Sequence, residues 1–301
     1  MNLLDSLRTW NRSRKWKRRN SNRRKRKDKL LSFGRFASGL LVDGVHGVFA
    51  VDPEDDFVAR KLLTTGTYSE PELALATQLT PSNGSVLVVG THIGALAIPL
   101  SRHCDHMIAV EANPRTFALL KLNLLLNGCH NVEAHNVAAA DAPGKISFLL
   151  NRDNSGGSKR MPKTMDESYV YDEPEIAEVR AEALDSLLQR KTFDLIFMDI
   201  EGSEYFAMQG MPNILSRSKT LIVEFVPHHL RNVAGVGPEA FASLIVPHFD
   251  WMYLPKYSAL VGKDRIGAEM KALYLANESH DGLVFLKSPL PPWLANSNLK
   301  S

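Results

Sequence analysis

The stretch "SVLVVGTHIGALAIPLS", which begins at Ser85, constrains the fold of this chain more than any other. Four apolar residues at positions 86–89 run into Gly90, and apolar residues then recur at a helical spacing. This pattern predicts a strand, a tight turn and a helix. The same alternation returns several times further along the chain, which predicts a parallel sheet covered by helices.

The predicted elements describe one α/β, Rossmann-like, doubly wound sheet that is mostly parallel and seven-stranded. Strands are predicted at 85–89, 107–111, 131–137, 194–199 and 219–224, and helices near 93–103, 114–127 and 203–214. Near the C-terminus, "DWMYLP" and "DGLVFLK" predict two more strands, so we expect an antiparallel edge strand. The segment 151–180 is rich in Asn, Gly, Ser and acids, and we expect a long excursion over the strand ends.

Composition divides the chain into three parts. Residues 1–30 hold thirteen Lys and Arg against two Asp, a net charge of +11, whereas the remainder holds 23 basic and 31 acidic residues, a net charge of −8. Residues 31–84 are expected to form a preamble packed on the core, with a helix in "SEPELALATQL" opened by a capping box of Ser69 and Glu72. Residues 85–301 are expected to form the α/β domain.

The basic arm of residues 1–30 predicts an anionic partner. A run such as "NRRKRK" repels itself and buries nothing, so we expect it to be disordered alone. An anionic membrane surface and a nucleic acid both fit this charge. Leu3, Leu4, Leu7 and Trp10 at helical spacing add a small apolar face, which favours the membrane, while a solvated tail is the alternative.

No apolar run reaches the roughly 18 residues that a membrane-spanning helix needs, and the first 30 residues lack the apolar centre of a signal peptide. We therefore expect a cytoplasmic protein, peripheral at the inner face of the membrane if the arm binds lipid. The two cysteines, Cys104 and Cys129, have no histidines at metal-ligand spacing, and both are expected to be reduced, buried thiols.

The first turn predicts an adenosyl ligand. Gly90 and Gly94 give G-x-x-x-G, without the third glycine of a dinucleotide fingerprint, so phosphate binding is not indicated. Glu111 ends the second strand 21 positions after Gly90, close to the offset of about 20 at which an acid binds ribose hydroxyls. A ribose site without a pyrophosphate site indicates S-adenosylmethionine.

Acidic residues and histidines at later strand ends are the candidate catalytic groups. Asp199 ends the apolar strand "DLIFMD", where a carboxylate is expected to point into the crevice, and Glu201 follows in the turn. Glu204 is either a site residue or the first-turn acid of the next helix. His228 and His229 are each candidates for a general base. Strand-end acids also allow a divalent metal, which the sequence does not establish.

Several segments together resemble the FkbM-type methyltransferases, which use S-adenosylmethionine and have a Rossmann-like fold. They are "VLVVGTHIGALAIPLS", "IAVEANP", "LLKLNLLLNG", "ALDSLL" and "FDLIFMDIEGSEYFAMQG", over approximately residues 45–226. The resemblance implies methyl transfer to a hydroxyl oxygen of a sugar, glycoconjugate or secondary metabolite. It places Gly90 and Gly94 under the methionine part, Glu111 on the ribose, and residues 136–138 beside the adenine.

The predicted site follows from these arguments together. The catalytic residues are Asp199, Glu201 and His228. The cofactor-binding residues are Glu72, Gly90, Thr91, His92, Gly94, Glu111, Ala112, Asn136, Val137 and Asp199.

Two departures from the family pattern concern the cofactor. Val88 stands where the family usually has an acid, and Thr91 and His92 stand where it usually has Ala-Asn. Without this carboxylate, we expect the affinity for the cofactor either to be reduced or to be supplied by Glu70, Glu72 or Asp199. Two other functions stay open: an RNA methyltransferase guided by the arm, and a catalytically silent scaffold docked at a membrane.

Overall fold

The computed structural model describes residue 28, residues 31–32 and residues 38–289. Apart from residue 28, the predicted basic arm therefore lies outside the described residues. Within the described part of the chain, no helix combines the length and the apolar character needed to cross a bilayer.

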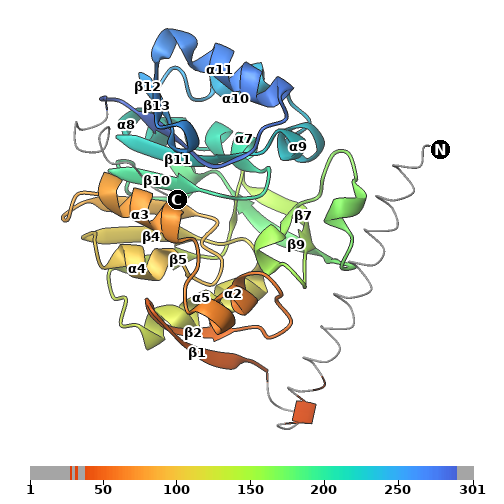
Figure 1. Cartoon of the computed structure of the whole chain (residues 1–301). Helices are drawn as coiled ribbons and strands as arrows, with labels where there is room; N and C mark the ends of the chain where they lie inside the picture. Colours follow the sequence, from red (N-terminus) through yellow and green to blue (C-terminus); the bar gives the residue numbers. More distant parts are fainter. Residues whose placement is uncertain (1–27, 29–30, 33–37, 290–301) are drawn as a thin grey trace.

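A central sheet of eight strands forms the core, in the order β13-β12-β14-β11-β10-β3-β4-β5 (Figure 1). Its strands are β3 (Ser85–Val89), β4 (His106–Val110), β5 (Val132–His135), β10 (Leu195–Met198), β11 (Thr220–Phe225), β12 (Trp251–Leu254), β13 (Ala259–Gly262) and β14 (His280–Leu286). The five strands from β5 to β11 pair in parallel, and β14 is antiparallel to both β11 and β12.

The predicted Rossmann-like, mostly parallel sheet is confirmed. The eighth strand is β13, which pairs with β12 through a short hairpin that the sequence prediction did not include. The antiparallel β14 lies inside the sheet, between β11 and β12, in addition to the antiparallel edge at β13.

Helices cover both faces of this sheet. They are α2 (Val58–Thr65), α3 (Glu70–Leu79), α4 (Ala97–Ser101), α5 (Pro114–Leu126), α6 (Leu184–Leu187), α7 (Glu204–Gln209), α8 (Pro212–Arg217), α9 (Pro227–His229), α10 (Pro238–Ser243) and α11 (Lys263–Leu275). Short turns of other helical types are η1 (Ser155–Gly157), η2 (Glu167–Tyr169), η4 (Pro255–Tyr257) and the π-helix η3 (Leu230–Ala234).

The alternation of side chains along β3 explains the two layers. Val86 and Val88 pack with α3 and α4 on one face, whereas Leu87 and Val89 pack into the larger cluster with α7, α8, α10 and α11 on the other. All four side chains are buried, as expected for a central strand of a parallel sheet. The apolar run that begins at position 86 is therefore the centre of the core.

A second sheet, β6-β9-β7-β8, lies beside the central one. Its strands are β6 (Ala138–Ala139), β7 (Gly144–Leu150), β8 (Lys159–Arg160) and β9 (Glu175–Glu182). The prediction of an irregular excursion over 151–180 is wrong for its last part, because β9 pairs antiparallel with β7 and buries Val179 against Phe148. The remaining loop is held by η1, η2 and β8.

The preamble begins with a hairpin of β1 (Leu40–Gly44) and β2 (Gly47–Val51). Its inner side chains pack with α2 and α5 in one apolar cluster, and Asn123 of α5 bonds to the backbone of Ala50. The capping box predicted at Ser69 and Glu72 is wrong. Ser69 has a left-handed backbone with φ +52° and its side chain makes no capping bond, because the chain turns sharply into α3 there.

The helix predicted at 203–214 is two helices, α7 and α8. Gly210 lies so close to the carbonyl of Ala140 that an added Cβ would sit 1.9 Å from its oxygen. Pro212 then begins α8, where it needs no amide hydrogen. The helix therefore ends at Gly210, where this close contact is made. The helix predicted near 93–103 is likewise shorter, at Ala97–Ser101, because residues 93–96 form the turn.

Gly90 sets the distance between two neighbouring strand ends. It has φ +91°, and an added Cβ would lie 1.8 Å from the carbonyl oxygen of Asp199. That distance is shorter than any van der Waals contact, and the neighbour is backbone. Only glycine therefore fits between the β3 turn and the end of β10.

We expect Gly90→Ala to lower the free energy of unfolding by about 3 kcal/mol or more, because it combines backbone strain with a backbone clash. Chemical denaturation measures this effect. Gly267→Ala is the matched control, since Gly267 lies exposed inside α11 with open space around it. The control should gain about 0.5 to 1 kcal/mol. Equal stability of the two variants would contradict the close approach.

Candidate functional site

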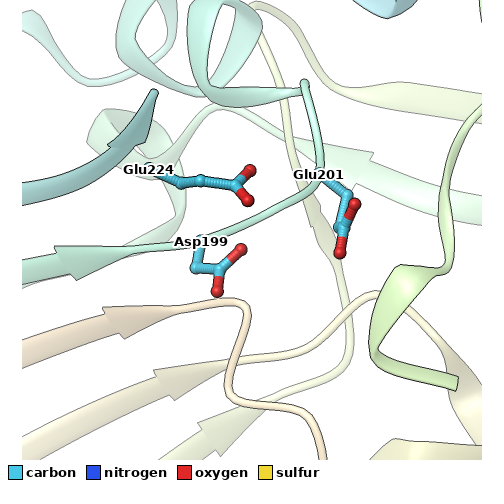
Figure 2. Close-up of side chains that lie close together, drawn as sticks. All are labelled: Asp199, Glu201 and Glu224. Atoms are coloured by element: carbon cyan, nitrogen blue, oxygen red, sulfur yellow. The ribbon is translucent and has the colours of Figure 1, made fainter. Parts of the chain in front are cut away.

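The carboxyl ends of the parallel strands form the candidate site. Asp199 directly follows β10, Glu201 lies two residues further in the turn, and Glu224 lies near the end of β11. Figure 2 shows these three side chains converging from neighbouring elements. The carboxyl ends of parallel strands are where ligands bind in open α/β sheets. The sequence thus placed Asp199 and Glu201 correctly at this edge of the sheet.

Two adjoining clefts open here and share Gly90, His92, Gly156 and Asp199. The first cleft has an apolar wall and is also lined by Glu111, Ala112 and Ser203. The apolar wall consists of Ala138, Ala139, Ile146, Phe148 and Ile200. The Ser203 hydroxyl is buried with no hydrogen-bond partner among the described residues, so it remains available to a ligand.

Glu111 is held in place by three hydrogen bonds. Its carboxylate accepts from the backbone N–H of His92 at 2.8 Å, the backbone N–H of Asn113 at 2.7 Å and the hydroxyl of Thr116 at 2.9 Å. A carboxylate has roughly four acceptor positions. The geometry therefore leaves room for about one further hydrogen bond to a ligand hydroxyl.

Several predicted cofactor residues do not line either cleft. Asn136 donates to the carbonyls of Glu111 and Ala112, which steadies the cleft wall from behind. Val137 is buried in the core cluster, and Gly94 lies against Leu120 of α5. The structure brings Ala138 and Ala139 to the cleft in place of residues 136 and 137.

The residues that depart from the family pattern have structural explanations. Thr91 lines the second cleft, and its hydroxyl donates to the carbonyls of Val88 and Val110. Val88 itself packs in the apolar layer with α3 and α4. The ring of His92 contacts the hydroxyl of Ser155 at 2.6 Å, and that hydroxyl also bonds to Asp55. His92 thereby connects the first turn to the excursion loop and to the preamble.

The second cleft is strongly acidic. Its lining includes five carboxylates, from Glu72, Asp199, Glu201, Glu224 and Asp281. Tyr68 and Phe57 add aromatic surface, and Lys61 and His92 are its basic groups. Glu72 and Asp199, two of the predicted replacements for the missing family carboxylate, are therefore present, whereas Glu70 pairs with His46 at 2.8 Å.

The environment of Asp199 and Glu224 favours their protonated forms. The pKa of Asp199 is raised well above its usual range by burial, and then by the charges of Glu224 and Glu201. The carboxylate of Asp199 reaches solvent through the cleft. It nevertheless lies deep in the protein, so desolvation is the largest cause of its raised pKa. Burial and the charges of Glu201 and Glu204 raise the pKa of Glu224 in the same way.

A buried lysine compensates part of this negative charge. The Nζ of Lys159 lies 2.8 Å from the Glu201 carboxylate and 3.5 Å from Nε2 of His229. Nδ1 of His229 lies 3.7 Å from Glu224. Burial, together with the charge of Lys159, lowers the pKa of His229. This imidazole is therefore held neutral between two carboxylates.

The structure does not bring His228 to this cluster. Its Nδ1 shares a 2.8 Å hydrogen bond with the hydroxyl of Tyr169, and its Nε2 lies 3.5 Å from Asp166. Glu204 also has a structural explanation, because its buried carboxylate accepts from the backbone N–H groups of Ile200 and Gly202. His229 thus takes the position that the sequence analysis gave to His228.

Oxygen atoms of Asp199, Glu201 and Glu224 lie within 4.8 Å of one another, an arrangement that suits a divalent cation. Glu201 already forms an ion pair with Lys159, however, and the lysine ammonium repels a cation. The metal remains a hypothesis.

Sequence comparison identifies the family. Residues 89–245 match the model of the methyltransferase FkbM domain, which is more than half of the chain. The chain belongs to the FkbM methyltransferase family. The match covers the first turn, the Glu111 strand end and the carboxylate cluster of this FkbM domain.

Other known proteins show weaker similarity. A tRNA/tmRNA (uracil-C(5))-methyltransferase from Marinomonas sp. is 30% identical over 103 residues, which span 34% of this chain and 26% of that relative. The FkbM methyltransferase of Methylobacillus flagellatus superposes with a TM-score of 0.41 at 13% identity, covering 68% of this chain and 44% of that one. M. jannaschii TYW2, solved with AdoMet, has a TM-score of 0.35 at 14% identity and 62% coverage of both chains.

Sequence reasoning missed Lys159, His229 as the inward histidine, Asp281 and the apolar wall of the first cleft. Lys159 and Phe148 come from the second sheet, which the sequence did not predict. Asp281 was within a predicted strand, but only the position of β14 next to β11 brings it to the cleft. The sequence held one signal for the inward histidine, the pair "HH" after β11. The alternation of side chains did not decide which of the two histidines points inward.

We expect Glu224→Gln to stabilise the fold at pH 8 by about 1 kcal/mol or more and to have much less effect at pH 4. A carboxyl with a raised folded-state pKa binds its proton more tightly in the folded protein than in the unfolded chain. Stability therefore falls as the pH rises through the interval between the two pKa values. Urea unfolding at both pH values, in buffer containing a chelator, measures this difference.

Glu178→Gln on the exposed surface of β9 is the control and should show little dependence on pH. An effect of Glu224→Gln that is equal at pH 4 and pH 8 would contradict the raised pKa.

Proposed function

We propose that this chain is an S-adenosylmethionine-dependent methyltransferase that methylates a hydroxyl oxygen of a sugar, glycoconjugate or secondary metabolite. The observation that carries the proposal is the pair of clefts that meet at Gly90 and Asp199. The lining of the first suits an adenosyl group, and the carboxylates of the second suit a hydroxyl acceptor.

The first cleft fits S-adenosylmethionine. Glu111 offers an acceptor for a ribose hydroxyl, Ala138 and Phe148 offer an apolar surface for a base, and Ser203 offers an unused hydroxyl. When bound, S-adenosylmethionine supplies a methyl group on a cationic sulfonium. The acidic second cleft suits such a cation at the junction, where Asp199 and Glu72 would face it.

The residues of the second cleft fit proton removal from an alcohol. A carboxylate with a raised pKa holds a proton more tightly than an ordinary one and is therefore a stronger base. Asp199 is the candidate base because it is open to the cleft, and His229 supports Glu201 and Glu224 from behind. Asp199 would accept the hydroxyl proton as the new oxygen–carbon bond forms, and Glu201 would orient the acceptor.

The partner of the basic arm belongs to the same proposal. An arm of +11 attached to a body of −8 would hold the protein peripherally at an anionic membrane surface. A second candidate function, methylation of RNA, is favoured by the charge of the arm alone. The acidic second cleft opposes it, since it would repel the phosphates beside a target nucleotide.

We expect isothermal titration of the full chain with S-adenosylmethionine and S-adenosylhomocysteine to show binding that Glu111→Ala weakens by about 10- to 100-fold, equivalent to one hydrogen bond to a charged acceptor. Glu133→Ala, an exposed acid on β5, should bind as the native chain does. Folded protein that binds neither ligand would exclude the enzyme and favour the silent scaffold.

The two adjacent histidines give a matched pair for catalysis. With labelled S-adenosylmethionine and a pool of envelope sugars and glycolipids as acceptors, His229→Ala should lower kcat by roughly 100-fold or more, because Glu201 and Glu224 beside the base would lose the imidazole that lies between them. His228→Ala should change kcat by less than about threefold, since its contacts lie with Tyr169 and Asp166. The reverse order of effects would reject the assignment of His229.

A further inference from the structure

One short stretch of the excursion loop lies between the two clefts. Ser155 lines the first cleft, Asn154 lines the second, and Gly156 lines both. Residues 154–157, which include the turn η1, are called the shared wall below. Because the two clefts meet along this stretch, its position sets the width of both.

Asp55 fastens the shared wall to the start of α2. One oxygen of this buried carboxylate, Oδ1, accepts from the backbone N–H groups of Phe57 at 2.7 Å and Val58 at 2.9 Å. The other oxygen, Oδ2, accepts from the hydroxyl and the backbone N–H of Ser155. Asp55 itself lines neither cleft. It therefore acts on the clefts through the residues that it holds.

The hydroxyl of Ser155 determines which nitrogen of His92 carries a hydrogen. A carboxylate only accepts hydrogen bonds, so the single hydroxyl hydrogen of Ser155 is donated to Asp55. The oxygen of Ser155 then accepts in its 2.6 Å contact with Nε2 of His92, and that nitrogen is the donor. The hydrogen bonds thus run in one direction, from His92 to Ser155 and from Ser155 to Asp55.

The backbone at position 92 does not by itself require histidine. His92 has φ +54°, a left-handed conformation that asparagine adopts at least as readily. Asparagine is also the residue that the family usually has here. Its side chain is shorter, however, and does not place a donor where Nε2 of His92 lies. The bond to Ser155 is therefore what distinguishes histidine from asparagine at this position.

We propose that His92 is a positioning residue, which holds the shared wall in place for the cofactor through Ser155 and Asp55. This role rests on the proposed function, since the wall lines the cleft assigned to S-adenosylmethionine. A wall that is fixed before the ligand arrives spares the ligand the cost of ordering it. Loss of the bond from His92 leaves Ser155 held by Asp55 alone and lowers the affinity for the cofactor.

Variants at position 92 separate the side-chain bond from the backbone conformation. His92→Asn suits the backbone but lacks the donor, and it should weaken binding of S-adenosylhomocysteine by about fivefold, as expected for one hydrogen bond. His92→Gln should recover most of that loss, because its longer side chain carries an amide N–H toward Ser155. Isothermal titration of the full chain measures both affinities. Ser243→Ala, which removes an exposed hydroxyl bond on α10, is the control and should bind as the native chain does.

Two further measurements report on the wall without any ligand. Nitrogen NMR of histidine-labelled protein should show a hydrogen on Nε2 of His92, with a signal that Ser155→Ala changes. Hydrogen exchange should be faster in His92→Asn than in the native chain at the amides of Ser155, Gly157 and Ser158, which donate within the wall or to Asp55. Urea unfolding shows whether the variants keep their global stability, so that a local effect is recognised as such.

The outcomes separate this role from the proposed function. Native affinity and native exchange in folded His92→Asn would overturn the proposal, as would a His92→Gln variant that binds no better than His92→Asn. Absence of S-adenosylhomocysteine binding by the native chain would reject the proposed function and, with it, the role for the cofactor, even where hydrogen exchange shows that His92 holds the wall.

Discussion

The close approach of the β3 turn to the end of β10 is the contact on which the rest of the site depends. Gly90 lets the carbonyl of Asp199 occupy the space that any other side chain would fill. Asp199 is thereby fixed at the junction of the two clefts, beside the turn that carries His92. The parallel register of β3 and β10, from Val86 with Leu195 onward, brings both strand ends to the same level.

The way the parallel strands end together also has an electrostatic consequence. Parallel strands that end together concentrate carboxylates, and the fold offsets this charge by different means. Lys159 neutralises Glu201, backbone N–H groups bond to Glu204, and raised pKa values favour protons on Asp199 and Glu224. The same arrangement that costs stability at high pH gives carboxyl groups whose proton affinity suits general base chemistry. Stability and the proposed activity therefore depend on the same residues.

The walls of the clefts come from outside the central sheet. The second sheet supplies Phe148 and Lys159, and the preamble supplies Tyr68 and Glu72. Hydrogen bonds from His92 to Ser155, and from Ser155 to Asp55, link the first turn, the excursion loop and the preamble. The site is complete only when three segments distant in sequence are packed together.

The sequence by itself determined the class of fold, the positions of the parallel strands along the chain and the strand-end residues Gly90, Glu111, Asp199 and Glu201. These features are local, because apolar periodicity, turn residues and a strand-end acid are all visible within a few positions. Tertiary structure alone decided that Asn136 braces a wall, that His229 faces inward in place of His228, and that Lys159 and Asp281 join the cluster. Those outcomes depend on how strands pair and helices break at long range, and the sequence pattern of a single segment holds no information about its neighbours in space.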